Sequence, residues 1–275
     1  MTSAPLRGMV LLASGSTRGV GEAIVCAAAR AGADVVLLAR ELPAGESDRH
    51  EQELRARIEG WGREFLLVRG DVRDGAGADR AVAAAIARFD RLDLVLNNAS
   101  VMCLDGTTDT PLAAFELMVE VNIRGTFLLT RAGLPYLRRA AHGQILTISP
   151  PIELEEGGLG SSVPYLATKY AATALTLGWA AEHADAGVSA NCLWPHAPLR
   201  DPGGVFLPAR RQKVYLPEIM GDAAVEVFAR PPGQVTGRML LDAEVLGAAG
   251  VTDLAPYVWH RPRHLTGAFP PTDSP

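Results

Sequence analysis

Tyr165 and Lys169 are four residues apart in the stretch "YLATK", within a segment whose apolar residues recur at helical spacing. On a helix, side chains at positions i and i+4 project from the same face. A lysine ammonium beside a phenol stabilises the phenolate and lowers the pKa of the tyrosine. Such a tyrosine can give a proton to a carbonyl oxygen or take one from an alcohol, so the pair predicts acid/base chemistry. The alternative is a chance pair on a helix surface.

Three serines upstream of Tyr165 could assist it: Ser149, Ser161 and Ser162. The latter two lie just before the predicted helix, where a serine is commonly an N-cap. Ser149 ends the apolar run "ILTIS", and the fixed backbone of Pro150 could aim its side chain inward. We therefore predict Ser149 as the hydroxyl that helps Tyr165 to hold a substrate oxygen, with a backbone or water donor as the alternative.

Gly15, Gly19 and Gly21 follow the first apolar run in "LLASGSTRGVGEAI". Glycines at the mouth of a helix let the backbone turn tightly and approach a pyrophosphate, whose charge is stabilised by the free N–H groups of the helix. A turn that merely packs helix on strand is the alternative. Its place after the first strand of a predicted parallel sheet favours dinucleotide binding.

Arg40 follows Ala39 at the end of the second predicted strand, where a carboxylate would hold the ribose 2′-hydroxyl of NAD. A guanidinium can instead pair with a 2′-phosphate, and Arg18 in the glycine turn adds a second cation. The pattern favours NADP(H), with two solvated arginines as the alternative. Asp71, which closes the third strand, could accept from the adenine amino group or cap the following helix.

Apolar runs rich in Val, Leu and Ile alternate with amphipathic segments at a regularity that predicts right-handed crossovers. We therefore expect a single doubly wound α/β domain over residues 1–275, with a parallel sheet and helices on both faces. The predicted strands are 8–14, 33–40, 64–71, 92–99, 143–149, 188–195 and 237–242; the predicted helices are 20–31, 48–60, 76–88, 112–140, 164–184 and a short one near 218–229.

Residues 196–236 break this rhythm, so we expect an insertion over the sheet edge that acts as a lid or substrate loop. Its apolar residues could form a pocket wall or simply pack against the sheet: Val205, Phe206, Leu207, Tyr215, Leu216, Ile219 and Met220. Residues 265–275 are rich in proline and small polar groups and are expected to be a loose tail.

The composition favours a small-molecule partner over nucleic acid, because the net charge is −5 and no basic face is evident. Three widely spaced cysteines predict free thiols in a reducing compartment, and no metal site is expected. No apolar run approaches the length of a membrane helix, so we expect a cytoplasmic protein without a membrane partner.

The motifs "SGSTRGVG", "DVR", "NNAS", "VNIRG" and "YLATK" occur in the order and spacing of the short-chain dehydrogenase/reductase superfamily, which the chain resembles over nearly its whole length. Within it, "NNAS", "TISPPIEL" and "CLWPHAP" look most like the hydroxysteroid dehydrogenase-like protein 2 group, which includes citronellol and citronellal dehydrogenase-like enzymes.

This resemblance assigns roles to particular residues. Tyr165 would be the acid/base, Lys169 would bind the nicotinamide ribose and tune Tyr165, Asn122 would hold a helix bend and a proton-relay water, and Asn98 would support the central strand and the cofactor. The full expected cofactor-binding set is Gly15, Ser16, Thr17, Arg18, Gly19, Val20, Gly21, Arg40, Asp71, Val72, Asn98, Ala99, Tyr165, Lys169 and Pro195.

Four positions depart from the superfamily pattern. Pro150 stands where the substrate-orienting serine would be, and His196 replaces the glycine after Pro195. Pro198 stands where a backbone N–H usually meets the nicotinamide carboxamide, and proline has no such donor. Arg200 falls near a position where a threonine often contacts the cofactor.

These observations together predict an NADP(H)-dependent oxidoreductase that interconverts a carbonyl and an alcohol on an apolar small molecule, of terpenoid, fatty or polyketide-like character. The alternative keeps the fold for non-redox chemistry, as a dehydratase, isomerase or cyclase-like enzyme, or for cofactor binding with little catalysis. The resemblance also implies a homo-oligomer, a dimer or tetramer, paired through the helices 112–140 and 164–184.

Overall fold

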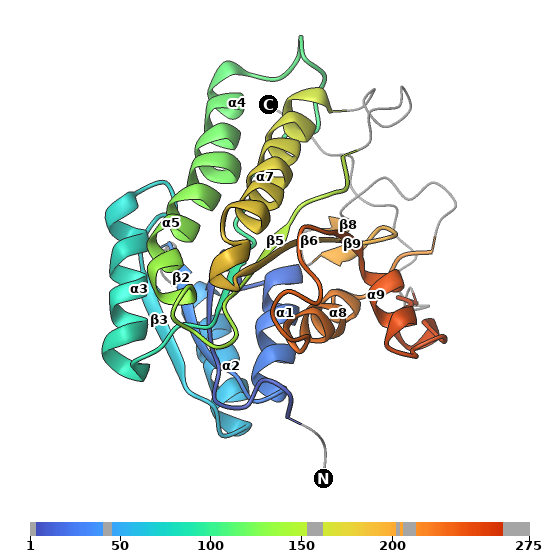
Figure 1. Ribbon diagram of the computed structural model, residues 1–275. Coiled ribbons are helices and arrows are strands. Elements are labelled where there is room, and N and C mark those ends of the chain that lie inside the picture. Colours follow the sequence, from blue (N-terminus) through green and yellow to red (C-terminus); the bar gives the residue numbers. More distant parts are fainter. Residues whose placement is uncertain (1–3, 41–45, 153–161, 202–203, 206–212, 261–275) are drawn as a thin grey trace.

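A parallel sheet with strand order β3-β2-β1-β4-β5-β6-β9 organises the protein in this computed structural model, which describes residues 4–40, 46–152, 162–201, 204–205 and 213–260 (Figure 1). Each apolar run predicted as a strand forms one. The strands are β1 (Val10–Ser14), β2 (Asp34–Ala39), β3 (Phe65–Arg69), β4 (Leu94–Asn97), β5 (Gln144–Ile148), β6 (Ser189–Trp194) and β9 (Met239–Leu241).

Both faces of the sheet are covered, because successive side chains of a strand point to opposite sides. In β1, Leu11 and Ala13 join one apolar cluster, whereas Val10 and Leu12 join the other. The first cluster lies under α1 (Gly19–Arg30), α2 (Glu46–Gly60), α8 (Glu218–Phe228) and α9 (Asp242–Ala248); the second lies under α3 (Gly75–Phe89), α5 (Thr126–Leu137) and α7 (Val163–Glu182) (Figure 1). The doubly wound fold is confirmed.

The segment predicted as one long helix, 112–140, consists of three parts. These are α4 (Leu112–Met118), a π-helical segment η1 (Val119–Gly125) and α5. A π-helical turn inserts an extra residue into the hydrogen-bond ladder and often marks a functional position. No helix in the described ranges is long and apolar enough to span a bilayer.

Helix α8 differs from the expectation of an insertion over the sheet edge. Its residues Ile219, Met220 and Phe228 are fully buried in the first cluster, and α8 packs on α1. Ile219 and Met220 are therefore core residues and not a pocket wall. The hairpin of β7 (Arg200–Asp201) and β8 (Gly204–Val205) precedes it. Phe206, Leu207 and the tail 265–275 lie outside the described residues, as does the side chain of Val205.

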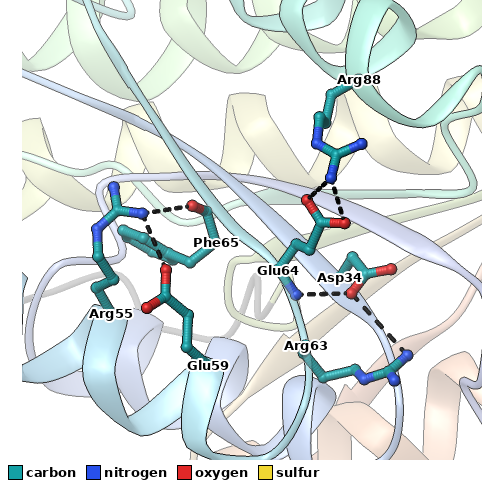
Figure 2. A network of polar contacts seen from close by, with 7 residues as sticks. All are labelled: Asp34, Arg55, Glu59, Arg63, Glu64, Phe65 and Arg88. Carbon is teal, nitrogen blue, oxygen red and sulfur yellow. Dashed lines mark hydrogen bonds and ion pairs between the residues drawn. The ribbon is translucent and has the colours of Figure 1, made fainter.

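Ion pairs join the amino ends of β2 and β3 to each other and join the start of β3 to α3 (Figure 2). Arg88 pairs with Glu64, and Arg63 pairs with Asp34 at 4.0 Å. Asp34 also accepts from the backbone N–H of Glu64 at 2.8 Å, which ties β2 to β3. These groups lie at the edge opposite the carboxyl ends of the strands, so we assign them to stability, and exposed pairs of this kind contribute only about 0–1 kcal/mol each.

Candidate active site

The glycine turn between β1 and α1 forms a cradle against the end of β4. Gly15 and Gly19 have φ angles of 61° and 59°, which favour glycine. A Cβ on Gly15 would come within 2.6 Å of the Ala99 backbone, and one on Gly21 within 2.4 Å of the Asn98 amide. Asn98 Nδ2 donates to the Gly15 carbonyl at 2.8 Å and so fixes the turn. The geometry suits the close approach of a pyrophosphate to the N-terminus of α1.

The ribose end of the cradle carries exposed cations. The guanidinium groups of Arg18 and Arg40 make neither a hydrogen bond nor an ion pair with any described residue. Asp71 lies beside them and is held by Arg73, whose Nη2 approaches the carboxylate at 2.9 Å. Burial acts to raise the pKa of Asp71, but the hydrogen bonds from Arg73 and the charges of Arg73 and Arg40 hold it below its usual value. Asp71 is therefore an ionised hydrogen-bond acceptor, and of its two cationic neighbours it is Arg73 that forms an ion pair with it.

One continuous cleft of about 420 Å³ joins this end to the catalytic pair. Every residue predicted to contact the cofactor lines it except Ser16, whose fully buried hydroxyl donates to the Ser14 carbonyl at 3.1 Å. Lining residues not predicted from the sequence as cofactor contacts are Leu38, Ala39, Gly70, Arg73, Ser100, Val101, Leu117, Val121, Ile148, Trp194, Leu199 and Arg200.

Tyr165 and Lys169 lie side by side on α7 and both line the cleft. Tyr165 is 5% exposed, and burial raises its pKa to about 12, with the Ser100 side chain acting in the opposite direction; the lowering expected from the lysine on the same helix is therefore not found. Burial lowers the pKa of Lys169 to about 8, and the charge of nearby Cys192 opposes this. Lys169 Nζ donates to the Ile148 carbonyl at 2.5 Å and lies 5.6 Å from the centre of the Trp194 ring.

Asn122 lies in η1, as expected for a residue that holds a helix bend, and all of its side-chain atoms that can form hydrogen bonds are engaged. Its Oδ1 accepts from the Val101 backbone at 2.8 Å, and its Nδ2 donates to the Val101 carbonyl and to the Thr168 hydroxyl, both at 2.9 Å. Asn122 is 1% exposed and does not line the cleft. Asn122 therefore joins the bend at η1 to the segment after β4 and to α7.

Ser149 is placed differently from the expectation that its side chain turns toward the substrate. Its hydroxyl donates to the Lys169 carbonyl at 2.7 Å and accepts from the Thr173 hydroxyl at 2.8 Å, and the residue does not line the cleft. The strand direction thus points Ser149 under α7. Ser162 occupies the N-cap position of α7, as expected, but its side chain makes no capping hydrogen bond and donates to the Leu104 carbonyl instead. Ser161 lies outside the described residues.

His196, which replaces the usual glycine, is turned toward α9. Its backbone N–H and its Nδ1 lie 2.9 Å and 2.7 Å from Oδ1 of the fully buried Asp242. Its ring also packs edge-on against Tyr215, with centroids 4.7 Å apart. His196 does not line the cleft, whereas the preceding Pro195 does. We infer that the contacts of His196 with Asp242 and Tyr215 fix the loop after β6. Pro195, Leu199 and Arg200 line the cleft at this point.

Comparison with known proteins identifies this arrangement. The sequence profile described as short chain dehydrogenase matches residues 9–198. The chain belongs to the short-chain dehydrogenase family. Members of this family are oxidoreductases of the dehydrogenase/reductase kind that use a nicotinamide cofactor, and the cradle, Tyr165 and Lys169 fit that group.

Relatives of the short-chain dehydrogenase family match most of this chain. Hydroxysteroid dehydrogenase-like protein 2 from Rattus norvegicus is 32% identical over 92% of the chain. The match covers 48% of that protein, so the chain spans about half the length of this curated relative.

Solved structures agree with this placement. A putative dehydrogenase from Xanthomonas campestris is 36% identical, with a TM-score of 0.83 and coverage of 92% of this chain and 93% of that one. A short chain dehydrogenase from Mycobacterium thermoresistibile is 35% identical, with a TM-score of 0.84 and coverage of 92% and 91%. The 32% identity to hydroxysteroid dehydrogenase-like protein 2 over 92% of the chain confirms the resemblance to that group.

Proposed function

We propose that this short-chain dehydrogenase interconverts a carbonyl and an alcohol on an apolar small molecule and uses NADP(H) for the purpose. The observation that carries the proposal is the continuity of one cleft, which has the glycine cradle and free guanidinium groups at one end and Tyr165 with Lys169 at the other. A nicotinamide dinucleotide bound there would supply or accept the hydride.

The residues of this chain supply pyrophosphate binding, proton transfer and stabilisation of the phenolate. Gly15, Gly19 and Gly21 admit the pyrophosphate to the N-terminus of α1. In reduction, the O–H bond of Tyr165 breaks and its proton goes to the substrate oxygen; in oxidation, the phenolate takes the proton back. Lys169, buried one helical turn along α7, favours the phenolate when it is charged.

Support for NADP(H) over NAD(H) comes from Arg18 and Arg40. Both are exposed at the cleft and unpaired among the described residues, and β2 ends on Ala39 without a carboxylate at this position. A 2′-phosphate could therefore pair with either guanidinium, and Ala39 and Arg40, the described residues at the end of β2, carry no carboxylate that would repel it.

Support for an apolar substrate comes from the cleft wall. Val101, Leu117, Val121 and Leu199 line it together with the ring of Trp194. Pockets of this kind bind small molecules through apolar contacts, with a few polar groups fixing the orientation. Because Ile219 and Met220 are core residues, the apolar surface comes from these cleft residues instead.

The proposal is tested by following NADPH absorbance with a panel of apolar aldehydes and ketones, and NADP⁺ reduction with the corresponding alcohols. We expect turnover of at least one apolar carbonyl or alcohol class and slower turnover with NADH or NAD⁺. Tight binding of NADPH without turnover across the panel in both directions would reject the redox step and favour non-redox chemistry on the same fold.

A further inference from the structure

The end of β5 is hydrogen-bonded to α7 at Lys169. The hydroxyl of Ser149 donates to the Lys169 carbonyl at 2.7 Å, and Lys169 Nζ donates to the carbonyl of Ile148, the residue before Ser149, at 2.5 Å. A carbonyl oxygen has two lone pairs, so the Lys169 carbonyl can accept from Ser149 as well as from the N–H four residues later in the helix. Lys169 is therefore held at its backbone and at its ammonium group by two successive residues.

Thr173, one helical turn further along α7, makes the second part of this connection. Its hydroxyl lies 2.8 Å from both the Ser149 hydroxyl and the Pro150 carbonyl and donates toward them. On the side of the sheet, the backbone N–H of Ser149 donates to the Leu193 carbonyl of β6 at 3.2 Å. The chain that leaves β5 is thus fixed to β6 on one side and to α7 on the other.

The two hydroxyls of this connection lie away from the cleft. Ser149 is 1% exposed and Thr173 is fully buried, and neither lines the cleft, whereas Ile148 and Lys169 both do. Hydrogen bonds in such a place are not exchanged with water, so they restrict the groups that they join. Any effect of these hydroxyls on the chemistry must act through Lys169 and the end of β5.

We propose that Ser149 and Thr173 are positioning residues for Lys169: by bonding the end of β5 to α7, they hold the ammonium group against the Ile148 carbonyl, on the helix that also carries Tyr165. This role replaces the contact with substrate that the sequence predicted for Ser149. The inference rests on the proposed function for its effect on turnover, but its effect on Lys169 itself does not. Both hydroxyls keep their protons throughout.

The groups around the Lys169 ammonium allow its protonation to be followed separately. The Ile148 carbonyl of β5 accepts from it, the Trp194 ring of β6 lies 5.6 Å away, and β6 also brings Cys192 near. Burial raises the pKa of Cys192 to about 11 and that of Tyr165, on α7, to about 12. Both therefore keep their protons while Lys169, whose pKa is lowered by burial to about 8, titrates.

NMR of the full chain labelled with [ε-¹³C]lysine gives the direct test. The chain has two lysines, Lys169 and Lys213, so Lys213→Arg removes one signal and assigns the other. In Ser149→Ala and in Thr173→Val, we expect the Lys169 midpoint to fall by about 0.5–1 pH unit, because the ammonium loses a fixed acceptor that favours its charged form. The space left by one hydroxyl oxygen is too small for a water molecule that could replace it.

Two further variants separate positioning from ordinary packing. Thr173→Ser keeps the hydroxyl and should keep the wild-type midpoint. Thr176 is equally buried one turn further along α7, but its hydroxyl donates to Thr147 within β5, at 2.7 Å, and not to the end of the strand. Thr176→Val should therefore lower the temperature of thermal unfolding about as much as Thr173→Val does and leave the Lys169 midpoint unchanged.

Turnover tests the consequence for the reaction. We expect Ser149→Ala and Thr173→Val each to lower kcat for carbonyl reduction about 10-fold, because Lys169 loses its alignment with Tyr165. KM for the carbonyl substrate should change less, since neither hydroxyl lines the cleft. Thr173→Ser and Thr176→Val should keep kcat within about twofold of the wild-type value.

Each result decides one part of the proposal. An unchanged or raised Lys169 midpoint in both Ser149→Ala and Thr173→Val would overturn it, and so would an equal shift in Thr176→Val. A loss of kcat in Ser149→Ala alone, with the midpoint unchanged, would show that Ser149 contacts the substrate. If the midpoints move as expected but the wild-type protein turns over no carbonyl or alcohol, the proposed redox function fails while the positioning of Lys169 stands.

Discussion

Asn122 donates a 2.9 Å hydrogen bond to the hydroxyl of Thr168, joining the π-helical segment to the helix that carries Tyr165. Together with its two bonds to Val101, this contact connects three separate segments at the catalytic end of the cleft. The bend at η1 therefore has a purpose in the site, because it brings a buried amide to both neighbours.

Replacing Asn122 with Leu should lower the stability of the protein and its turnover rate. The change removes the partner of both backbone groups of Val101 and the donor to the Thr168 hydroxyl, which still donates to the Tyr165 carbonyl, at a cost of about 2–4 kcal/mol in the free energy of unfolding. Turnover should fall about 10-fold or more as Tyr165 loses its alignment. Urea unfolding and kcat measure the two effects.

Thr126→Val is the matched control, because the Thr126 hydroxyl donates only to the Asn122 carbonyl, at 2.8 Å. Its loss should cost about 1 kcal/mol and leave kcat nearly unchanged. Equal effects of the two substitutions would mean that Asn122 is an ordinary buried polar residue.

Lys169 should lower the stability of the cofactor-free protein at neutral pH. Its pKa is lowered from 10.5 to about 8 by burial, so the unfolded chain binds a proton more readily than the folded one. Below pH 8 the buried cation costs about 3 kcal/mol, and this cost disappears as the pH rises from about 8 to about 10.5. Lys169→Met should therefore be more stable than the wild type at pH 7 while losing activity.

Urea unfolding at several pH values measures this difference. The difference in the free energy of unfolding between Lys169→Met and the wild type should shrink toward pH 10. Lys213→Met, which alters an exposed lysine, should have the same stability as the wild type at every pH. A variant less stable than the wild type at pH 7 would show that the Ile148 hydrogen bond and the Trp194 contact outweigh the burial of the charge.

Arg40 should set the preference for NADPH. One charge-assisted contact to a 2′-phosphate is worth about 1.5–3 kcal/mol, and solvent screening at this exposed position reduces it, so we expect NADPH to bind about 10-fold more tightly than NADH. Arg40→Asp should narrow or reverse the ratio, as measured by calorimetry. Arg7→Asp makes the same change in net charge away from the cleft and should preserve it. Equal affinities for the two cofactors in the wild type would refute the assignment.

We propose that a second copy of the chain packs on α4 and α5. Leu112, Phe115 and Phe127 are 71%, 38% and 41% exposed there, an unusual set for a free helix surface. Light scattering at micromolar concentration should give a multiple of the chain mass. The Leu112→Glu/Phe127→Glu double variant should be smaller, whereas Trp61→Glu, at an exposed aromatic beside α2, should not. A wild-type monomer would reject the proposal.

The sequence predicted the strands and the cradle well, because both follow from local patterns. Buried parallel strands such as β1 and β2 are continuous apolar runs, and Gly15 and Gly21 are required by backbone contacts that no other residue permits. Helix α9 was missed: its seven residues are too few for a helical period to stand out.

Side-chain directions were harder to predict. Ser149 ends β5 as expected, but whether its hydroxyl faces the cleft or α7 depends on the pleat of the strand and on Thr173, 24 residues away. For the same reason Ser100 was not predicted as a residue that lines the cleft, although its position directly after Asn98 and Ala99, at the end of a central strand, was a usable signal. The helix α8 was predicted, but its location was wrong. The loop-rich residues before it suggested an insertion over the sheet edge, whereas its apolar face is buried in the first cluster.

Tyr165→Phe tests the central claim most directly, because it removes the proton that the mechanism moves and little else. With NADPH and the best carbonyl substrate of the panel, we expect kcat to fall by at least about 100-fold while NADPH affinity stays within about twofold of the wild-type value. Turnover at the wild-type rate in Tyr165→Phe, with cofactor bound normally, would contradict the assignment of Tyr165 as the acid/base and with it the proposed mechanism.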